Sequence, residues 1–318
     1  MELLQWLDVL LFIKKHQFWF ILGIGLLVLL LLPLIAHLVR RMRSAMISDT
    51  PITVSGDGLI RWVYHPGNAQ HIGKRDEQQD AFGFSDVTDF AAVRSQGVLA
   101  VLADGMGGVA GGKEAAKAAV EAVMQHFQQQ VEHAQSAQTL LEEAAQRAHR
   151  AIEAVQRTMP SDAGLAGSTL CVVWIREGRL SWISLGDSRI YLVSGEQLTL
   201  LTVDDNYGME LDEKARRGLI TVEQAQASTE RHMLTAYLGS PDFDELALDV
   251  YSIDIEPGDK VMLCSDGIYG SVTEAEMQQA VKHPVQQACD ALQELALAKE
   301  NQYQDNMTAI MIAVEVRK

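Results

Sequence analysis

Five aspartates recur in short motifs along the chain, most of them beside glycine. They are Asp80, Asp104, Asp187, Asp266 and Asp305. Short apolar runs typical of buried strands precede three of these aspartates, over residues 97–103, 182–185 and 261–264. Burying an unpaired carboxylate costs far more free energy than the end of a strand can return. Several carboxylates at strand ends therefore predict a bound cation.

The donor set available to such a cation is rich in oxygen and lacks softer ligands. None of the nine histidines forms a His-x-His or His-x-x-x-His pair, and the three cysteines show no Cys-x-x-Cys spacing. Hard oxygen donors favour Mg2+ or Mn2+ over zinc or copper. Two such cations sharing a carboxylate generate hydroxide at neutral pH and clamp a phosphoryl oxygen. The predicted chemistry is therefore hydrolysis.

Two simpler interpretations compete with this one. An isolated Asp-Gly pair is usually only a turn signal, and it is the repetition of such pairs at strand ends that favours a metal site. Cys264 lies two residues before Asp266, but its neighbours are apolar and no basic group lies nearby in the sequence to activate it. We interpret Cys264 as a buried thiol. An odd number of cysteines without close spacing also favours a reducing compartment.

The elements that must position these residues form a mixed pattern from residue 59 onward. Apolar residues at helical spacing predict helices over residues 112–133, 140–157, 211–229 and 274–298, the third broken at Gly218. Apolar or alternating runs predict strands over residues 169–176, 180–185, 189–194, 197–200, 246–255, 260–265 and 307–316, with hairpin turns at Gly178 and Gly195. Consecutive strands followed by pairs of helices predict an α+β fold in which helices cover antiparallel sheets.

An uncharged apolar segment, residues 18–39, precedes this domain. As a helix rising about 1.5 Å per residue it is roughly 33 Å long, enough to cross a hydrocarbon core of about 30 Å. We predict a leader over residues 1–17, a transmembrane helix over 18–39, a linker over 40–58 and one domain over 59–318. The alternative is a cleaved signal peptide, but the long acid-containing leader and the adjoining Arg40 favour an anchor.

Flanking charge predicts the orientation of this segment. Lys14 and Lys15 precede it, whereas Arg40, Arg41 and Arg43 follow it. The larger basic count predicts a single-pass protein of the inner (plasma) membrane with its C-terminal domain in the cytoplasm.

The formal net charge is -16, and no basic stripe interleaved with aromatic residues is present. Nucleic acid is therefore not an expected partner.

Taken in order, the motifs resemble those of a known family, the metal-dependent Ser/Thr protein phosphatases of the 2C type (PPM). The matching segments are Arg75 with Gln79-Asp80, Val101-Leu102-Ala103-Asp104-Gly105-Met106-Gly107-Gly108, Gly167-Ser168-Thr169, Gly186-Asp187-Ser188-Arg189, Leu201-Thr202-Val203-Asp204, Leu263-Cys264-Ser265-Asp266-Gly267 and Asp305-Asn306-Met307-Thr308. The resemblance runs from about residue 69 to residue 316. It implies two antiparallel sheets packed as a central sandwich flanked by helices.

The resemblance also implies an activity and a site. The activity is hydrolysis of phosphoserine and phosphothreonine in proteins by a hydroxide that two Mn2+ or Mg2+ ions activate. The resemblance implies that Asp104 bridges both ions, that the Gly105 carbonyl binds one of them, and that Asp266 and Asp305 bind the other. It implies that Asp80 acts through bound waters and that Asp187 holds a weaker third metal together with Asp266. Arg75 is the implied phosphate ligand. A phosphorylated protein substrate and a paired Ser/Thr kinase are the implied partners.

Several positions depart from the family pattern. Gln79 replaces an acidic residue, and Lys113 stands where many members have Glu, so we interpret Lys113 as one half of a surface ion pair. Arg189 is interpreted as the anchor of a loop, through a carboxylate or a backbone carbonyl. The departures leave two alternatives open. One is a catalytically weak or inactive membrane-tethered 2C-like binding or sensor module; the other is a phosphatase acting on a small phosphoester.

Overall fold

The computed structural model describes residues 61–107, 111–160, 164–299 and 302–317. The predicted leader, transmembrane helix and linker (residues 1–17, 18–39 and 40–58) lie outside these ranges. Within them, no helix combines the length and apolar character needed to cross a bilayer. All of the described residues belong to one compact unit.

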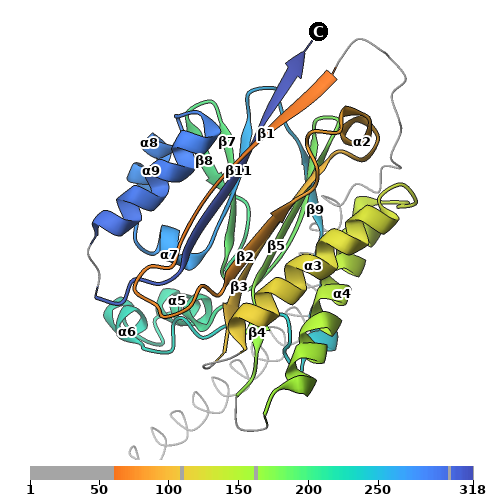
Figure 1. Cartoon of the computed structure of the whole chain (residues 1–318). Coiled ribbons are helices and arrows are strands. Elements are labelled where there is room, and N and C mark those ends of the chain that lie inside the picture. The colour runs from red at the N-terminus through yellow and green to blue at the C-terminus, as the bar shows by residue number, and fades with distance from the viewer. Residues whose placement is uncertain (1–60, 108–110, 161–163, 300–301, 318) are drawn as a thin grey trace, which may run out of the picture. The chain divides into compact units, whose positions relative to one another are not determined.

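The described residues form two antiparallel sheets stacked between layers of helices (Figure 1). Sheet A has the strand order β1 (Arg61–His71), β11 (Met307–Arg317), β10 (Lys260–Cys264), β7 (Arg189–Ser194) and β8 (Gln197–Leu200). Sheet B has the order β2 (Asp80–Phe84), β3 (Val98–Met106), β5 (Leu170–Arg176), β6 (Arg179–Leu185) and β9 (Tyr251–Asp254), and β4 (Gly167–Ser168) pairs with β3. The predicted sandwich is confirmed for this part of the chain.

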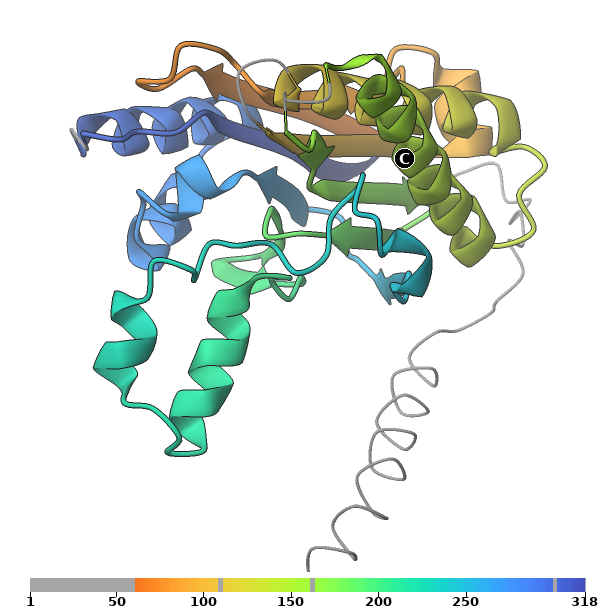
Figure 2. The same cartoon turned by 90° about the horizontal axis from the view of Figure 1, so that it is seen from below.

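Helices cover the outer face of each sheet. Those over sheet B are α3 (Gly112–Gln130) and α4 (Ala137–Thr158); those over sheet A are α7 (Asp266–Tyr269), α8 (Glu274–Ala280) and α9 (Val285–Ala298). The remaining helical elements are α2 (Phe90–Gln96), α5 (Tyr207–Arg216), α6 (Val222–Ala227) and the 3-10 turn Phe243–Glu245. The α5–α6 pair stands out to one side of the sandwich (Figure 2).

The apolar residues of the central strands alternate between two buried clusters. In β3, Leu99 and Val101 pack with α3 and α4, whereas Ala100 and Leu102 pack between the two sheets. A third cluster lies between sheet A and α7 to α9. This period of two follows from the alternation of side chains across a pleated strand. Both faces of the central strands are therefore buried.

Two predicted elements were too long. The single helix predicted over residues 274–298 is two helices, α8 and α9. Pro284 has no backbone N–H and disfavours the helical conformation in the residue before it, so one helix cannot run through it. Helix α8 ends at Ala280, and α9 starts directly after Pro284. The strand predicted over residues 246–255 is limited to β9, an edge strand that pairs with β6 only over residues 179–182.

The predicted turns are confirmed. Gly178, Gly195 and Gly218 have φ angles of 78°, 58° and 71°, a region that glycine adopts at little cost. Gly218 separates α5 from α6, as the broken helix pattern predicted. The prediction missed β1, β2 and α2. Pro66 interrupts the apolar pattern of β1. The structure tolerates this proline because β1 is an edge strand, and one side of an edge strand forms no ladder hydrogen bonds.

Candidate metal and phosphate site

Asp80 and Asp104 face each other across neighbouring strands of sheet B. Their Cα atoms are register partners in the β2–β3 pair. Asp80 begins β2, as a carboxylate at a strand end should. Asp104 differs from the prediction because β3 continues through it to Met106, and Gly105 pairs with Ser168 of β4. The extra pairing extends the strand past the apolar run that the sequence shows.

Asp80 is held by hydroxyl groups from sheet A. Its Oδ2 accepts hydrogen bonds from Ser265 Oγ at 2.8 Å and from Thr308 Oγ1 at 2.6 Å. Gln70 Nε2 in turn donates to Thr308 Oγ1 at 3.1 Å. Asp80 is only 6% exposed, and its other oxygen, Oδ1, is buried without a hydrogen-bond partner. One oxygen is thus fixed while the other remains available.

The remaining three carboxylates come from both sheets to the same end of the sandwich. Asp187 follows β6, Asp266 begins α7 directly after β10, and Asp305 lies just before β11. The Oδ1 atom of Asp266 is also buried without a hydrogen-bond partner. The structure therefore gathers all five predicted aspartates at one end.

The carboxylates raise one another's pKa values. Burial raises the pKa of Asp104 well above its usual range, and the charges of Asp80, Asp266, Asp305 and Asp187 add to the effect. Burial followed by the charge of Asp305 raises the pKa of Asp266 to about 7. Mutual repulsion of this kind is relieved by protonation or by a cation among the carboxylates.

Gly105 is required by the packing around its α-carbon. A Cβ atom there would come within 2.0 Å of the Gly112 carbonyl oxygen and 2.7 Å of the Gln79 carbonyl oxygen. The Gly105 N–H donates to the Gln79 carbonyl at 3.1 Å. The start of α3 thus packs directly against the backbone that was predicted to bind a metal, a close approach that only glycine permits.

Arg75 lies on the loop that joins β1 to β2. Its Nη2 donates to Asp305 Oδ2 at 2.6 Å, and the Asn306 N–H donates to Asp305 Oδ1 at 2.8 Å. Asn306 organises the loop: its Oδ1 accepts from the Gln79 N–H at 2.7 Å, and its Nδ2 donates to the Glu77 carbonyl at 3.0 Å. The predicted phosphate ligand is thereby placed beside a predicted metal ligand.

The same loop is fastened to α3 by an ion pair. Lys113 Nζ lies 3.1 Å from Glu77 Oε1, and both side chains are partly exposed. The predicted role of Lys113 in a surface ion pair is confirmed. An exposed pair of this kind contributes little to stability, about 0–1 kcal/mol. The pair links the segment between Arg75 and Asp80 to the first turn of α3.

The chemistry of the donor set fits a hard divalent cation. It offers carboxylates with raised pKa values, the buried free oxygens of Asp80 and Asp266, and a backbone carbonyl at Gly105. As arranged, however, no three His, Cys, Asp or Glu side chains in the described ranges form a group that could hold a metal ion. Each oxygen of Asp305 already accepts a hydrogen bond, one of them from Arg75.

Sequence reasoning named the charged residues but not the neutral ones that hold them. Ser265, Thr308 and Asn306 lie inside the motifs and received no role, although each stands next to or near an aspartate that was predicted to bind metal. Thr169 is similar: its Oγ1 accepts from the Asp104 N–H at 2.9 Å. Gln70 lies outside every motif, and only the pairing of β1 with β11 brings it to Thr308.

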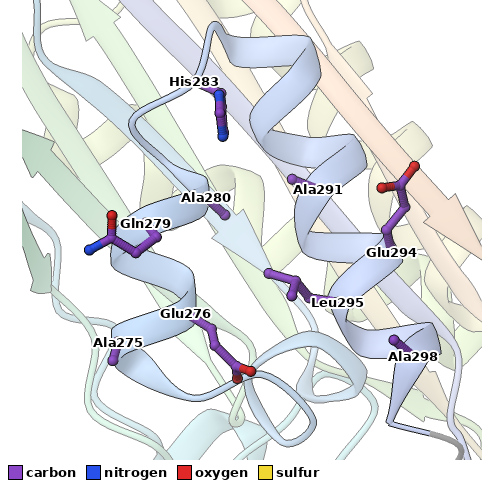
Figure 3. A pocket seen from close by; sticks show the side chains of 9 residues that line it. All are labelled: Ala275, Glu276, Gln279, Ala280, His283, Ala291, Glu294, Leu295 and Ala298. Carbon is purple, nitrogen blue, oxygen red and sulfur yellow. The ribbon is translucent and has the colours of Figure 1, made fainter.

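Two other features do not contribute to this site. Cys264 is fully buried, and burial raises the pKa of its thiol to about 12, as expected of an inert thiol. A cavity of about 730 Å³ lies between α8 and α9, where Leu295, Ala280 and Ala291 line it (Figure 3). It contains none of the predicted site residues.

A family comparison covers most of the described residues. The model of the protein phosphatase 2C family matches residues 68–310. Among curated proteins, the serine/threonine protein phosphatase PstP of Mycobacterium tuberculosis is 32% identical over 219 residues, which are 68% of this chain and 40% of that protein. The chain thus spans less than half the length of that relative. The serine/threonine phosphatase stp of Listeria innocua is 26% identical over 218 residues, 67% of this chain and 83% of that protein.

Solved structures agree with this assignment. The catalytic domain of PstP, in complex with two manganese ions, superposes with a TM-score of 0.65 at 27% identity, covering 80% of this chain and 99% of that one. The PPM Ser-Thr phosphatase MsPP of Mycobacterium smegmatis, in complex with cacodylate, gives a TM-score of 0.62 at 28% identity, covering 78% of this chain and 97% of that one.

Proposed function

The chain belongs to the protein phosphatase 2C family, and on this premise we propose that it hydrolyses phosphoserine and phosphothreonine in proteins. The observation that carries the proposal is the set of five aspartates at one end of the sandwich, three of them with pKa values raised by burial and by one another's charge. Arg75, the predicted phosphate ligand, lies against the same set.

We assign the metal ligands as the resemblance to the family implies them. Asp104, Asp266, Asp305 and the Gly105 carbonyl would hold two Mn2+ or Mg2+ ions directly, and Asp80 would act through bound waters. A third, weaker ion would lie between Asp187 and Asp266. When bound, the ions would lower the pKa of water and neutralise phosphoryl oxygens. The two manganese ions of the PstP catalytic domain support this choice of metal.

The residues of the chain supply binding and orientation. Arg75 presents a planar guanidinium, which suits two oxygens of a phosphate. Because Arg75 is bonded to Asp305, it has to release or share that carboxylate when substrate and metal bind. Ser265 and Thr308 hold one oxygen of Asp80 and keep the other directed away from them. The charge of the site and the orientation of the Asp80 carboxylate are thus set before substrate binds.

We propose further that residues 18–39 anchor the domain to the inner (plasma) membrane, with the domain in the cytoplasm. Support comes from the length of the uncharged segment and from the three arginines that follow it. Phosphoproteins occur where ATP and kinases occur, which agrees with this orientation. The substrate would then be a phosphoprotein modified by a Ser/Thr kinase that acts at the same membrane.

Comparing substrates tests the proposal. The full-length protein with Mn2+ should hydrolyse phosphoserine and phosphothreonine peptides with a higher kcat/KM than an aryl phosphate or a small metabolic phosphoester. A higher kcat/KM for the small phosphoester would favour the small-molecule alternative. Binding of Mn2+ without release of phosphate from any of these substrates would favour the inactive binding or sensor module.

A further inference from the structure

Arg189, the first residue of β7, makes contacts that depend on the shape of its guanidinium. Nε and Nη2 donate to the two oxygens of Asp204 at 3.0 and 2.8 Å. The guanidinium carbon lies 3.7 Å from the centre of the Tyr269 ring. Nη1 also donates to Tyr191 Oη at 3.4 Å. A bidentate bond combined with stacking requires a planar fork, which lysine lacks.

On one side, these contacts lead to Asp187. Asp204 is followed by Asp205, whose N–H donates to the Gly186 carbonyl at 2.9 Å and whose Oδ2 accepts from the Gly186 N–H at 3.1 Å. Gly186 immediately precedes Asp187. Holding Asp204 therefore also fixes the turn that carries Asp187.

On the other side, the contacts lead to Asp266. Helix α7 is a single turn, with Asp266 as its first residue and Tyr269 as its last. Residues three apart on a helix lie on the same side of it. A guanidinium pressed against the Tyr269 ring therefore restricts rotation of α7 and with it the direction of the Asp266 carboxylate. The sequence hypothesis that Arg189 anchors a loop is confirmed, and the loop it anchors leads to the site.

We propose that Arg189 is a positioning residue that sets the placement of Asp187 relative to Asp266, and through it the affinity of the cation held between them. The inference rests on the proposed function, since it concerns the weaker metal assigned to these two carboxylates. Asp187 and Asp266 come from different sheets, β6 in sheet B and β10 with α7 in sheet A. Arg189 joins the two segments through its contacts with Asp204 and Tyr269.

Four variants of the full-length protein separate this role from general stabilisation. Arg189→Lys keeps the charge but loses the bidentate bond and the stacking. Tyr269→Leu removes the ring, whereas Tyr269→Phe keeps it. Arg179→Lys is the matched control, because Arg179 donates to Asp254 at 2.8 Å at the opposite end of the sandwich.

The readout is calorimetric titration of each metal-free protein with Mn2+ alone, alongside its melting temperature. Residues that orient metal ligands typically change affinity by about 10–100-fold when replaced. We expect Arg189→Lys and Tyr269→Leu to weaken the weakest Mn2+ binding step by at least about ten-fold. The tighter steps should weaken less than the weakest one, because Asp104 and Asp305 also hold those ions, and Tyr269→Phe and Arg179→Lys should match the wild type.

Three outcomes would overturn the proposal. The first is an Arg189→Lys isotherm that superimposes on that of the wild type. The second is an equal loss of Mn2+ affinity in Tyr269→Phe and Tyr269→Leu, which would show that Arg189 does not act through the Tyr269 ring. The third is equal weakening of every step in proportion to the loss of melting temperature. If the wild type itself binds no Mn2+, the proposed function fails rather than this inference.

Discussion

The two ends of the β-sandwich place their acidic residues in opposite surroundings. Where β1 begins, Asp254 pairs with Arg179 at 2.8 Å and Glu315 with His65 at 3.1 Å, and all four side chains are partly or fully accessible. At the other end, the five aspartates of the candidate site face one another. None of the ion pairs among the described residues reaches Asp80, Asp104, Asp187 or Asp266; Arg75 pairs only with Asp305.

This difference indicates that the acidic residues at the two ends have different roles, solubility at the exposed end and chemistry at the site. An exposed acid next to a base costs the fold almost nothing and contributes little, about 0–1 kcal/mol. Buried acids next to other acids destabilise the metal-free fold. Hydrogen bonds from hydroxyl and backbone groups hold these carboxylates in position. The site end is therefore expected to respond strongly to substitution, pH and metal, and the opposite end weakly.

Replacing Asp104 with Asn should have the largest effect. It removes the ligand proposed to bridge both ions and with it several kcal/mol of transition-state stabilisation, on the order of 10³-fold or more in kcat/KM. It also removes one of the mutually repelling charges, so the metal-free protein should melt at a higher temperature than the wild type. Phosphopeptide kinetics and calorimetric melting check both results; retained activity would show that the metal ligands are misassigned.

Replacing Arg75 with Ala should have the next largest effect. A hydrogen bond to a charged group contributes about 1.5–3 kcal/mol, so kcat/KM should fall roughly 10–150-fold, mainly through KM. Because Asp305 is also released, the Mn2+ affinity of the free protein should stay the same or rise. Kinetics paired with calorimetric Mn2+ titration tests this. A large fall in Mn2+ affinity would contradict the assignment of Arg75 to phosphate.

The pH dependence of metal binding should follow the Asp266 carboxyl group. Its pKa is raised from 3.8 to about 7, so below pH 7 a cation has to displace a proton. Mn2+ affinity should therefore rise from pH 5.5 to 7. Because the raised pKa means that the folded state binds this proton more tightly, stability of the metal-free protein should fall over the same range. Affinity independent of pH between 5.5 and 8 would contradict this.

The smallest effect is expected at the opposite end. Asp254→Asn removes the exposed pair with Arg179 and should change the free energy of unfolding by less than about 1 kcal/mol. The phosphopeptide kcat/KM should stay within about two-fold of the wild type, because this pair lies at the opposite end of the sandwich from the site. A loss comparable to that of Asp104→Asn would show that the two ends are not as different as their charge pairing indicates.

The sequence was sufficient to predict the sandwich of two antiparallel sheets and to single out the five aspartates that the structure gathers at one end of it. Glycine-flanked aspartates after apolar runs are a local signal, and Asp187 and Asp266 lie where that signal placed them. Gly178, Gly195 and Gly218 marked turns for an equally local reason, the positive φ angle that each requires.

The parts that sequence reasoning missed depend on pairing between distant segments. Asp104 lies within β3 because β4, more than sixty residues later, pairs with Gly105 and Met106. Gln70 reaches Thr308 only because β1 lies beside β11. The bond between Arg75 and Asp305 likewise joins residues 230 positions apart. No local pattern carries this information.

The most direct test of the central claim is phosphate release from a phosphothreonine peptide by the full-length protein, measured with Mn2+ and again after the metal is chelated. We predict steady release with Mn2+, no release after chelation, and recovery when Mn2+ is restored. Release that continues undiminished in excess chelator, or no release at any Mn2+ concentration, would contradict the claim that the aspartate cluster is a metal-dependent phosphatase site.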